Sequence, residues 1–271
     1  MIKGKVLLFT IFIILFGLVG CSDYYHLTKE KSKATAAERK EAGMEYYEEG
    51  DYLKAITLFE LVMNHYKFTT EGEELYFTYA MANYKMADYF LAGYYFKRFI
   101  RRYPTSKHAE EALFLSALCS VHNSPEYSLD QTETYNALDQ MQIFIDQYPN
   151  SSRIDTCNQI MDKMRAKLEL KQFEYARLYY QTEFYKSAVV ALEQTLVKYP
   201  ESAYKEEILY LLVKSNFELA INSVESKKIE RLNNTIKSYR TFVAEFPESD
   251  KRKELDLIKA RTENAIQETK K

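Results

Sequence analysis

The sequence contains few of the residues that usually mark turns between strands. Its 271 residues include only seven glycines and five prolines, and the sequence also lacks tryptophan. Hairpins typically carry Asn-Gly or Asp-Gly pairs, and no strand-like alternation bounded by such pairs occurs here. This shortage disfavours a β-sheet fold and favours an all-α fold. The 24 tyrosines and 16 phenylalanines can then supply packing between helices without a single compact core.

Excess charge and cysteine are also scarce. The 37 basic and 39 acidic residues nearly cancel, which argues against a general nucleic-acid binder. Of the three cysteines, Cys21 follows an apolar run, and Cys119 and Cys157 lie among apolar neighbours in helical stretches. This second pair predicts either one disulfide in an oxidising compartment or two buried free thiols.

No motif for catalysis, metal binding or cofactor binding is present. The chain has no H-E-x-x-H, no glycine-rich phosphate loop and no G-x-S-x-G. Cys119 and His122 have a metal-ligand spacing, but a second pair of ligands is missing. We therefore expect no catalytic residue, no metal and no cofactor, and we do not expect an enzyme.

Four of the five prolines belong to one recurring hexapeptide. Its copies are RRYPTS at 101–106, DQYPNS at 146–151, VKYPES at 197–202 and AEFPES at 244–249. Proline ends a helix because it lacks an N–H and clashes with the preceding turn. The serine that follows can accept a hydrogen bond from a free N–H at the start of the next helix. The hexapeptide therefore predicts a hinge between two helices.

Each hinge closes an amphipathic helix. Before Pro104, apolar or small residues occur at steps 0, 4, 7, 8 and 11, which is one face of an α-helix: Ala92, Phe96, Phe99, Ile100 and Tyr103. Related ladders precede the other three hinges, and one runs from Ala55 to Tyr66 with Lys67 in the place of proline. The chain therefore contains five related helices.

Another helical stretch precedes each ladder, and the pairs resemble tetratricopeptide repeats across roughly residues 36–250. Ala80, Ala92, Phe96 and Pro104 fall where such a repeat places its small, small, aromatic and proline residues. We predict an all-α, right-handed superhelical solenoid of about five helix pairs. A capping helix should follow near 250–268, and one unbroken helix should run from about 153 to 181.

The amino terminus has the features of a lipoprotein signal. Two lysines precede an apolar run from Val6 to Val19, and Leu18-Val19-Gly20-Cys21 resembles the bacterial lipobox. That resemblance implies cleavage after residue 20, lipidation of Cys21 and a lipidated tether over 21–35; an ordinary signal anchor is the alternative. In many Gram-negative bacteria, an aspartate directly after the lipidated cysteine retains a lipoprotein at the inner membrane. Residue 22 is serine here, so by analogy we expect the protein at the outer membrane, facing the periplasm.

The first helix of each pair should line the concave surface of a solenoid. The helical register places methionine, leucine and aromatic residues there, which suits an apolar peptide. The candidate residues are Met44, Tyr47, Phe77, Met81, Tyr84, Phe114 and Leu118. The alternative is that some of them only pack against the next repeat.

The lipobox, the five repeats, FKRFIRRYPTSKHAEEALFLSALC and the linker SPEYSLDQTETYNAL together resemble the BamD family of outer-membrane β-barrel assembly lipoproteins. The resemblance covers nearly the whole chain and implies a non-catalytic role. Repeats in 36–125 would receive unfolded barrel precursors. Repeats in 126–271 would dock on the POTRA domains of the barrel subunit BamA. Lys67 departs from the family pattern at the first hinge.

Two other functions remain open. A periplasmic scaffold such as the Tol–Pal-associated coordinator of envelope constriction shares the Y-P-x-S hinges, but it normally lacks a lipobox. Helical lipoproteins that bind envelope glycans are typically much longer and carry further domains. Cys21 and the chain length therefore favour barrel assembly.

Overall fold

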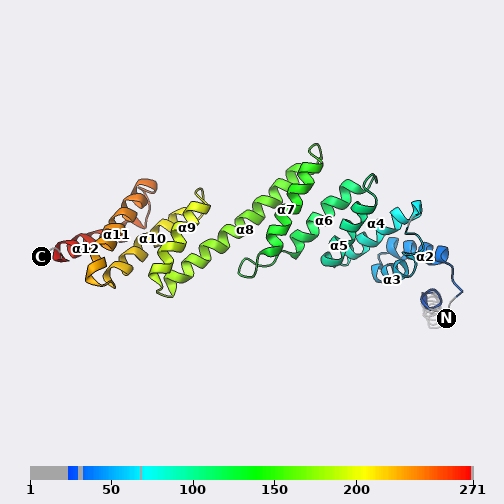
Figure 1. Cartoon of the computed structure of the whole chain (residues 1–271), viewed down its shortest axis with the longest axis horizontal. Helices are drawn as coiled ribbons and strands as arrows, with labels where there is room; N and C mark the ends of the chain where they lie inside the picture. The colour runs from blue at the N-terminus through cyan, green and yellow to red at the C-terminus, as the bar shows by residue number, and fades with distance from the viewer. Residues whose placement is uncertain (1–23, 30–32, 68, 270–271) are drawn as a thin grey trace, which may run out of the picture. The chain divides into compact units, whose positions relative to one another are not determined.

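A computed structural model describes residues 24–29, 33–67 and 69–269 of the chain. Helices and the turns between them make up these residues, and no strand occurs among them (Figure 1). The signal peptide and Cys21, where lipidation is predicted, lie outside the described residues.

The helices follow one another in pairs. The bounds of the paired helices are α2 (Ala36–Glu48) with α3 (Tyr52–Val62), α4 (Thr70–Lys85) with α5 (Tyr89–Arg102), α6 (Ala109–Asn123) with α7 (Thr132–Gln147), α8 (Ile154–Gln181) with α9 (Tyr185–Lys198), and α10 (Lys205–Ile221) with α11 (Glu225–Glu245). A final helix, α12 (Arg252–Thr269), packs on α10 and α11. The predicted all-α repeat of five helix pairs is confirmed, as are the capping helix and the long unbroken helix α8.

The hinges end their helices as the prolines predict. α5, α7, α9 and α11 each stop one residue before the aromatic of the hexapeptide. That aromatic leaves the helical conformation, with φ between −126° and −132°, because the following proline excludes it. The first hinge, with Lys67, differs: its chain continues in turns after α3, and Thr69 accepts a hydrogen bond from the Gly72 N–H.

The described residues form two compact units. One extends to Glu126 and resumes over Asp130–Met161; the other comprises Tyr127–Leu129 and the chain from Asp162 onward. Lys171 holds the short segment within the second unit, because its Nζ donates to the carbonyl oxygens of Tyr127, Ser128 and Leu129 at 3.1, 3.2 and 2.7 Å.

Small residues let the paired helices approach closely in both units. Ala80 and Ala92 are fully buried in the first unit, and Ala176 and Ala188 in the second. Gly43 takes the same place in α2, where an added Cβ would lie 2.7 Å from the ring of buried Phe59. The small residues of the repeat pattern therefore mark the positions where the backbones of paired helices approach each other closely.

The two described cysteines are buried free thiols, which answers the alternative that the sequence leaves open. Burial raises the pKa of the Cys119 thiol to about 12. Burial also raises the pKa of Cys157. Both thiols are therefore protonated and unreactive at neutral pH.

Candidate functional site: the repeat junctions and the first-helix face

Each hinge serine joins two successive repeats. Its hydroxyl accepts a hydrogen bond from the backbone N–H two residues later, which lies just ahead of the next helix and not within its first turn as predicted. The same hydroxyl donates to a glutamate of the preceding first helix, which lies near the start of α4, α6 and α10 and in the middle of α8. The pairs are Ser106–Glu73 at 2.5 Å, Ser151–Glu110 at 2.6 Å, Ser202–Glu169 at 2.6 Å and Ser249–Glu206 at 2.5 Å.

A second contact recurs beside each serine–glutamate pair. The residue two positions after the serine covers an aromatic ring four positions after the glutamate. The distances from the covering ring centre or cationic group to the ring centre are 4.2 Å for His108 on Phe77, 5.3 Å for Arg153 on Phe114, 4.7 Å for Tyr204 on Phe173 and 5.3 Å for Lys251 on Tyr210. At each junction, we call the serine, the glutamate, the aromatic residue and the covering residue together a junction motif. Its covering residue is flat or cationic, which suits the face of an aromatic ring.

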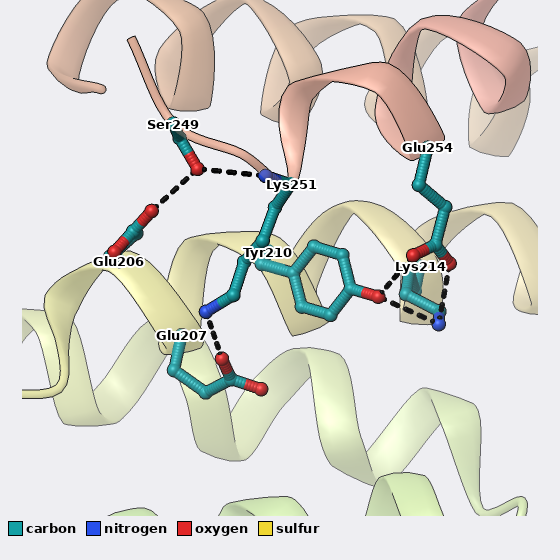
Figure 2. A network of polar contacts seen from close by, with 7 residues as sticks. All are labelled: Glu206, Glu207, Tyr210, Lys214, Ser249, Lys251 and Glu254. Atoms are coloured by element: carbon teal, nitrogen blue, oxygen red, sulfur yellow. Dashed lines mark hydrogen bonds and ion pairs between the residues drawn. The ribbon is translucent and has the colours of Figure 1, made fainter. Parts of the chain in front are cut away.

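The last junction motif carries an additional polar network (Figure 2). Lys251 also forms an ion pair with Glu207. The Tyr210 hydroxyl donates to Glu254 of α12 at 2.6 Å, and Lys214 pairs with the same carboxylate at 2.8 Å. The network therefore joins α10 to the capping helix.

Charges within this network perturb two pKa values. The hydrogen bond from Lys214 lowers the pKa of Glu254, and the Tyr210 hydroxyl adds to the effect. Burial alone would lower the pKa of Lys214, but hydrogen bonding with Glu254 and Tyr210 outweighs burial and raises it. Both groups are therefore held in their charged forms.

The first junction replaces the covered ring by an ion pair. Lys40 stands at the aromatic position of the motif and Glu71 at the covering position, and the two side chains pair. The Lys40 ammonium also lies 4.9 Å from the centre of the Tyr66 ring. The ion pair thus joins the two positions that make the ring contact at the other junctions, and the cation–π contact joins Lys40 to the aromatic residue of the first hinge.

The candidate binding residues gather mostly around one hydrophobic cluster of the first unit. Met44, Tyr47, Met81, Tyr84 and Leu118 are partly buried against that cluster, in which Phe77 is a buried member. Phe114 belongs to the neighbouring cluster, and Leu118 contacts both. We call the seven candidate residues on α2, α4 and α6 the first-helix face.

Members of the first-helix face differ in accessibility. Phe77 is only 8% exposed, because it lies beneath His108 and beside Phe96 and Phe99. Phe114 is partly exposed beneath Arg153. The surface open to a ligand is therefore formed chiefly by the partly exposed residues Met44, Tyr47, Met81, Tyr84 and Leu118.

Tyr84 and Tyr47 each interact with residues outside their own helix. Tyr84 meets the edge of Tyr89 at 5.4 Å, and Tyr89 stacks on His122 of α6 at 4.0 Å. Burial raises the pKa of Tyr47, with smaller contributions from charges that include Glu111 of α6. Tyr84 of α4, Tyr89 of α5 and His122 of α6 thus form one aromatic group beside the cluster.

Sequence reasoning missed the junction glutamates and Tyr89. The glutamates lie 33 to 43 residues before their serines. The pattern of the hinge and the pattern of the first helix, each taken alone, therefore do not predict the pairing. One signal was available: each first helix after the first pair contains Glu-x-x-x-Phe or Glu-x-x-x-Tyr in the same register.

No helix in the described part of the chain combines the length and apolar character needed to cross a bilayer. Over the same residues, no three His, Cys, Asp or Glu side chains are grouped closely enough to bind a metal ion.

Comparison with known proteins gives matches over most of the chain. The YfiO family model, described as an outer membrane lipoprotein, matches residues 32–189 and 166–262. An Aquifex aeolicus protein provisionally named outer membrane protein assembly factor BamD is 25% identical over 245 residues, covering 90% of this chain and 79% of the relative. Outer membrane protein assembly factor BamD of Caulobacter vibrioides is 22% identical over 186 residues, covering 69% and 61%.

Proposed function

The chain belongs to the YfiO family of outer membrane lipoproteins, and from this premise we propose that it is a non-catalytic scaffold for β-barrel assembly. The names of both relatives support assembly of outer membrane proteins as the process. In this proposal Cys21 carries the lipid, and the protein faces the periplasm from the outer membrane.

We propose that the first-helix face receives an extended, aromatic-rich segment of an unfolded barrel precursor. The observation that carries the proposal is that partly exposed methionine, leucine and tyrosine side chains of α2, α4 and α6 pack against one hydrophobic cluster. Methionine adapts its shape to different apolar partners, and tyrosine adds a hydroxyl for peptide hydrogen bonds. Such a surface suits many precursors of different sequence.

The proposed binding of a precursor to the first-helix face is weak. Burying two or three apolar side chains of a precursor contributes roughly 1.5–3 kcal/mol each, and ordering an extended chain offsets much of that gain. A modest net affinity allows the precursor to move on to the next component. The proposed next component is a BamA-like barrel subunit, whose POTRA domains dock on the repeats in 126–271.

A matched pair of double variants tests the precursor site. Met81→Ser with Tyr84→Ser removes two partly exposed side chains of the first-helix face. Leu53→Ser with Leu61→Ser removes two exposed apolar side chains of α3, a second helix outside that face. Phe77 is left intact because it is buried.

Binding of a fluorescent peptide from a barrel precursor is measured by anisotropy. We expect the Met81/Tyr84 variant to bind at least tenfold more weakly, which is about 1.4 kcal/mol. The Leu53/Leu61 variant should bind as the parent does. Equal weakening in both variants, or in neither, contradicts the proposed site.

Co-purification of the barrel subunit from detergent-solubilised envelopes tests the division of labour. The Met81/Tyr84 variant should retain its barrel-subunit partner, because repeats contact mainly their neighbours. Loss of that partner together with peptide binding would refute separate binding halves. Recovery of Tol components in place of a barrel subunit would refute the assembly role.

A further inference from the structure

α5 carries an exposed stripe that neither the repeat packing nor the first-helix face explains. Its residues are Phe90, Tyr94, Arg98 and Arg101, spaced by four, four and three positions and thus on one side of the helix. Phe90 is 81% exposed and Tyr94 is 47% exposed. We call these four residues the α5 stripe.

The stripe is cationic at its carboxyl end. α5 contains Lys97, Arg98, Arg101 and Arg102 and no acidic residue. Among the described residues, Lys97, Arg98 and Arg101 have no carboxylate within ion-pair distance. Arg98 and Arg101, with Arg102, line a shallow surface hollow. The charges of Arg98 and Arg101 are therefore available to an anion.

Arg98 links the cationic and aromatic parts of the stripe. It donates to the Tyr94 hydroxyl at 3.1 Å, and its guanidinium lies 5.5 Å from the centre of that ring. Aromatic rings beside arginine, with an apolar ring projecting further, are typical of surfaces at the boundary between lipid headgroups and acyl chains. An acidic protein would satisfy the arginines, but it would not require Phe90 to project into solvent.

The described amino-terminal residues place the proposed lipid close to the first repeat. Tyr24 meets the edge of Tyr46 of α2 at 5.7 Å, and Arg39 donates to the Leu27 carbonyl at 2.8 Å. Cys21 precedes Tyr24 by three positions in the sequence, a span of at most about 11 Å when extended. A lipid on Cys21 would therefore hold the first repeat near the bilayer.

The same chemistry recurs beside this anchor. Tyr25 is largely exposed, and the Lys29 ammonium lies 4.2 Å from the centre of its ring. An exposed tyrosine with a cation thus occurs both next to the proposed anchor and on α5. This recurrence, the unpaired charge and the exposed Phe90 all favour a membrane surface as the partner.

We propose that the α5 stripe is a second membrane contact, which binds the anionic surface of the bilayer to which the protein is anchored. Arg98 and Arg101 bind lipid phosphates, and Phe90 enters the boundary between headgroups and acyl chains. The contact would fix the orientation of the amino-terminal repeats over the membrane. The proposal rests on the lipid anchor of the proposed function, and it is independent of precursor binding.

The absence of tryptophan from the sequence makes a direct test possible. Phe90→Trp places a unique fluorophore on the stripe of the lipidated, full-length protein. Val197→Trp places it at an 84% exposed position of α9, in the other compact unit. Each protein is reconstituted into vesicles of phosphatidylcholine and phosphatidylglycerol with brominated acyl chains, which quench tryptophan only at short range.

We expect strong quenching of the tryptophan at position 90 and little at position 197. Adding Arg98→Ser and Arg101→Ser should reduce the ratio of docked to undocked chain about fivefold for each cation removed. Lys237→Ser with Arg240→Ser removes two exposed cations with the same spacing from α11 and should change nothing. Quenching at position 90 should be lost in vesicles of phosphatidylcholine alone and at high salt, because both conditions remove the attraction between the arginines and the bilayer.

Two results would overturn the membrane contact while leaving the anchor standing. One is flotation of both tryptophan variants with vesicles but equal quenching at the two positions. The other is a spectral change at position 90 that requires an acidic protein partner and not lipid, which would assign the stripe to that partner. Failure of both variants to float overturns the anchor and the stripe contact together.

Discussion

At the scale of single residues, burial determines which side chains can react or bind. Cys119 and Cys157 lie in apolar surroundings, and their pKa values are raised because the thiolate would lose its hydration. Phe77 has the residue type of a binding site but is covered by His108. Residue type alone therefore does not separate a ligand surface from a packed one.

The thiols provide a test of lipidation at Cys21. The native, mature protein should react with no equivalent of a maleimide at pH 8, because two thiols are buried and the third is bonded to lipid. In denaturant it should react with two of the three cysteines in the sequence. A fast-reacting thiol in the native protein, together with a third in denaturant, would show that Cys21 is free.

Hinge serines should contribute measurably to stability. Ser202→Ala removes an acceptor for the Tyr204 N–H and a donor to Glu169. We expect the free energy of unfolding to fall by about 1 kcal/mol, as for a lost cap or hydrogen bond. Urea unfolding measures the change. Ser187→Ala, at an exposed position of α9, is the control and should stay within about 0.5 kcal/mol of the parent.

At the scale of elements, the sequence predicts helices well and their partners poorly. Proline after an aromatic defines four helix ends, and an uninterrupted apolar face defines the length of α8. The junction glutamates could not be predicted in this way, because each partner lies on the preceding first helix. Similarly, no local pattern shows that His108 covers Phe77, since their contact depends on how repeats stack.

The capping helix should show a pH-dependent attachment through Glu254. Because Lys214 lowers the pKa of Glu254 in the folded protein, the stabilisation is complete above the ordinary glutamate pKa. It is lost as the pH falls through the lowered pKa. Glu254→Gln should therefore destabilise the protein at pH 7 by less than about 1 kcal/mol, since the pair is partly exposed.

At pH 3 the difference between the parent and Glu254→Gln should shrink toward zero. Chemical unfolding at the two pH values measures it. Glu263→Gln, which alters a surface pair within α12, is a control for loss of a carboxylate without loss of the link to α10. A destabilisation by Glu254→Gln that is the same at pH 7 and pH 3 would contradict the account.

At the scale of the whole molecule, the repeats present distinct surfaces that need no catalytic group. The first-helix face is the proposed precursor site, the α5 stripe the proposed membrane contact, and the repeats in 126–271 the proposed dock for the barrel subunit. Units that contact mainly their neighbours can bear separate sites. This organisation agrees with membership of an outer membrane lipoprotein family.

Photocrosslinking in living cells tests the proposed precursor site on the first-helix face. A photoreactive amino acid is placed at position 81 of the first-helix face, or at exposed position 257 of α12 as a control. We predict that position 81 crosslinks to newly made outer-membrane barrel precursors and that position 257 does not. Crosslinking of precursors at 257 but not at 81, or at neither position, would contradict a precursor site on the first-helix face.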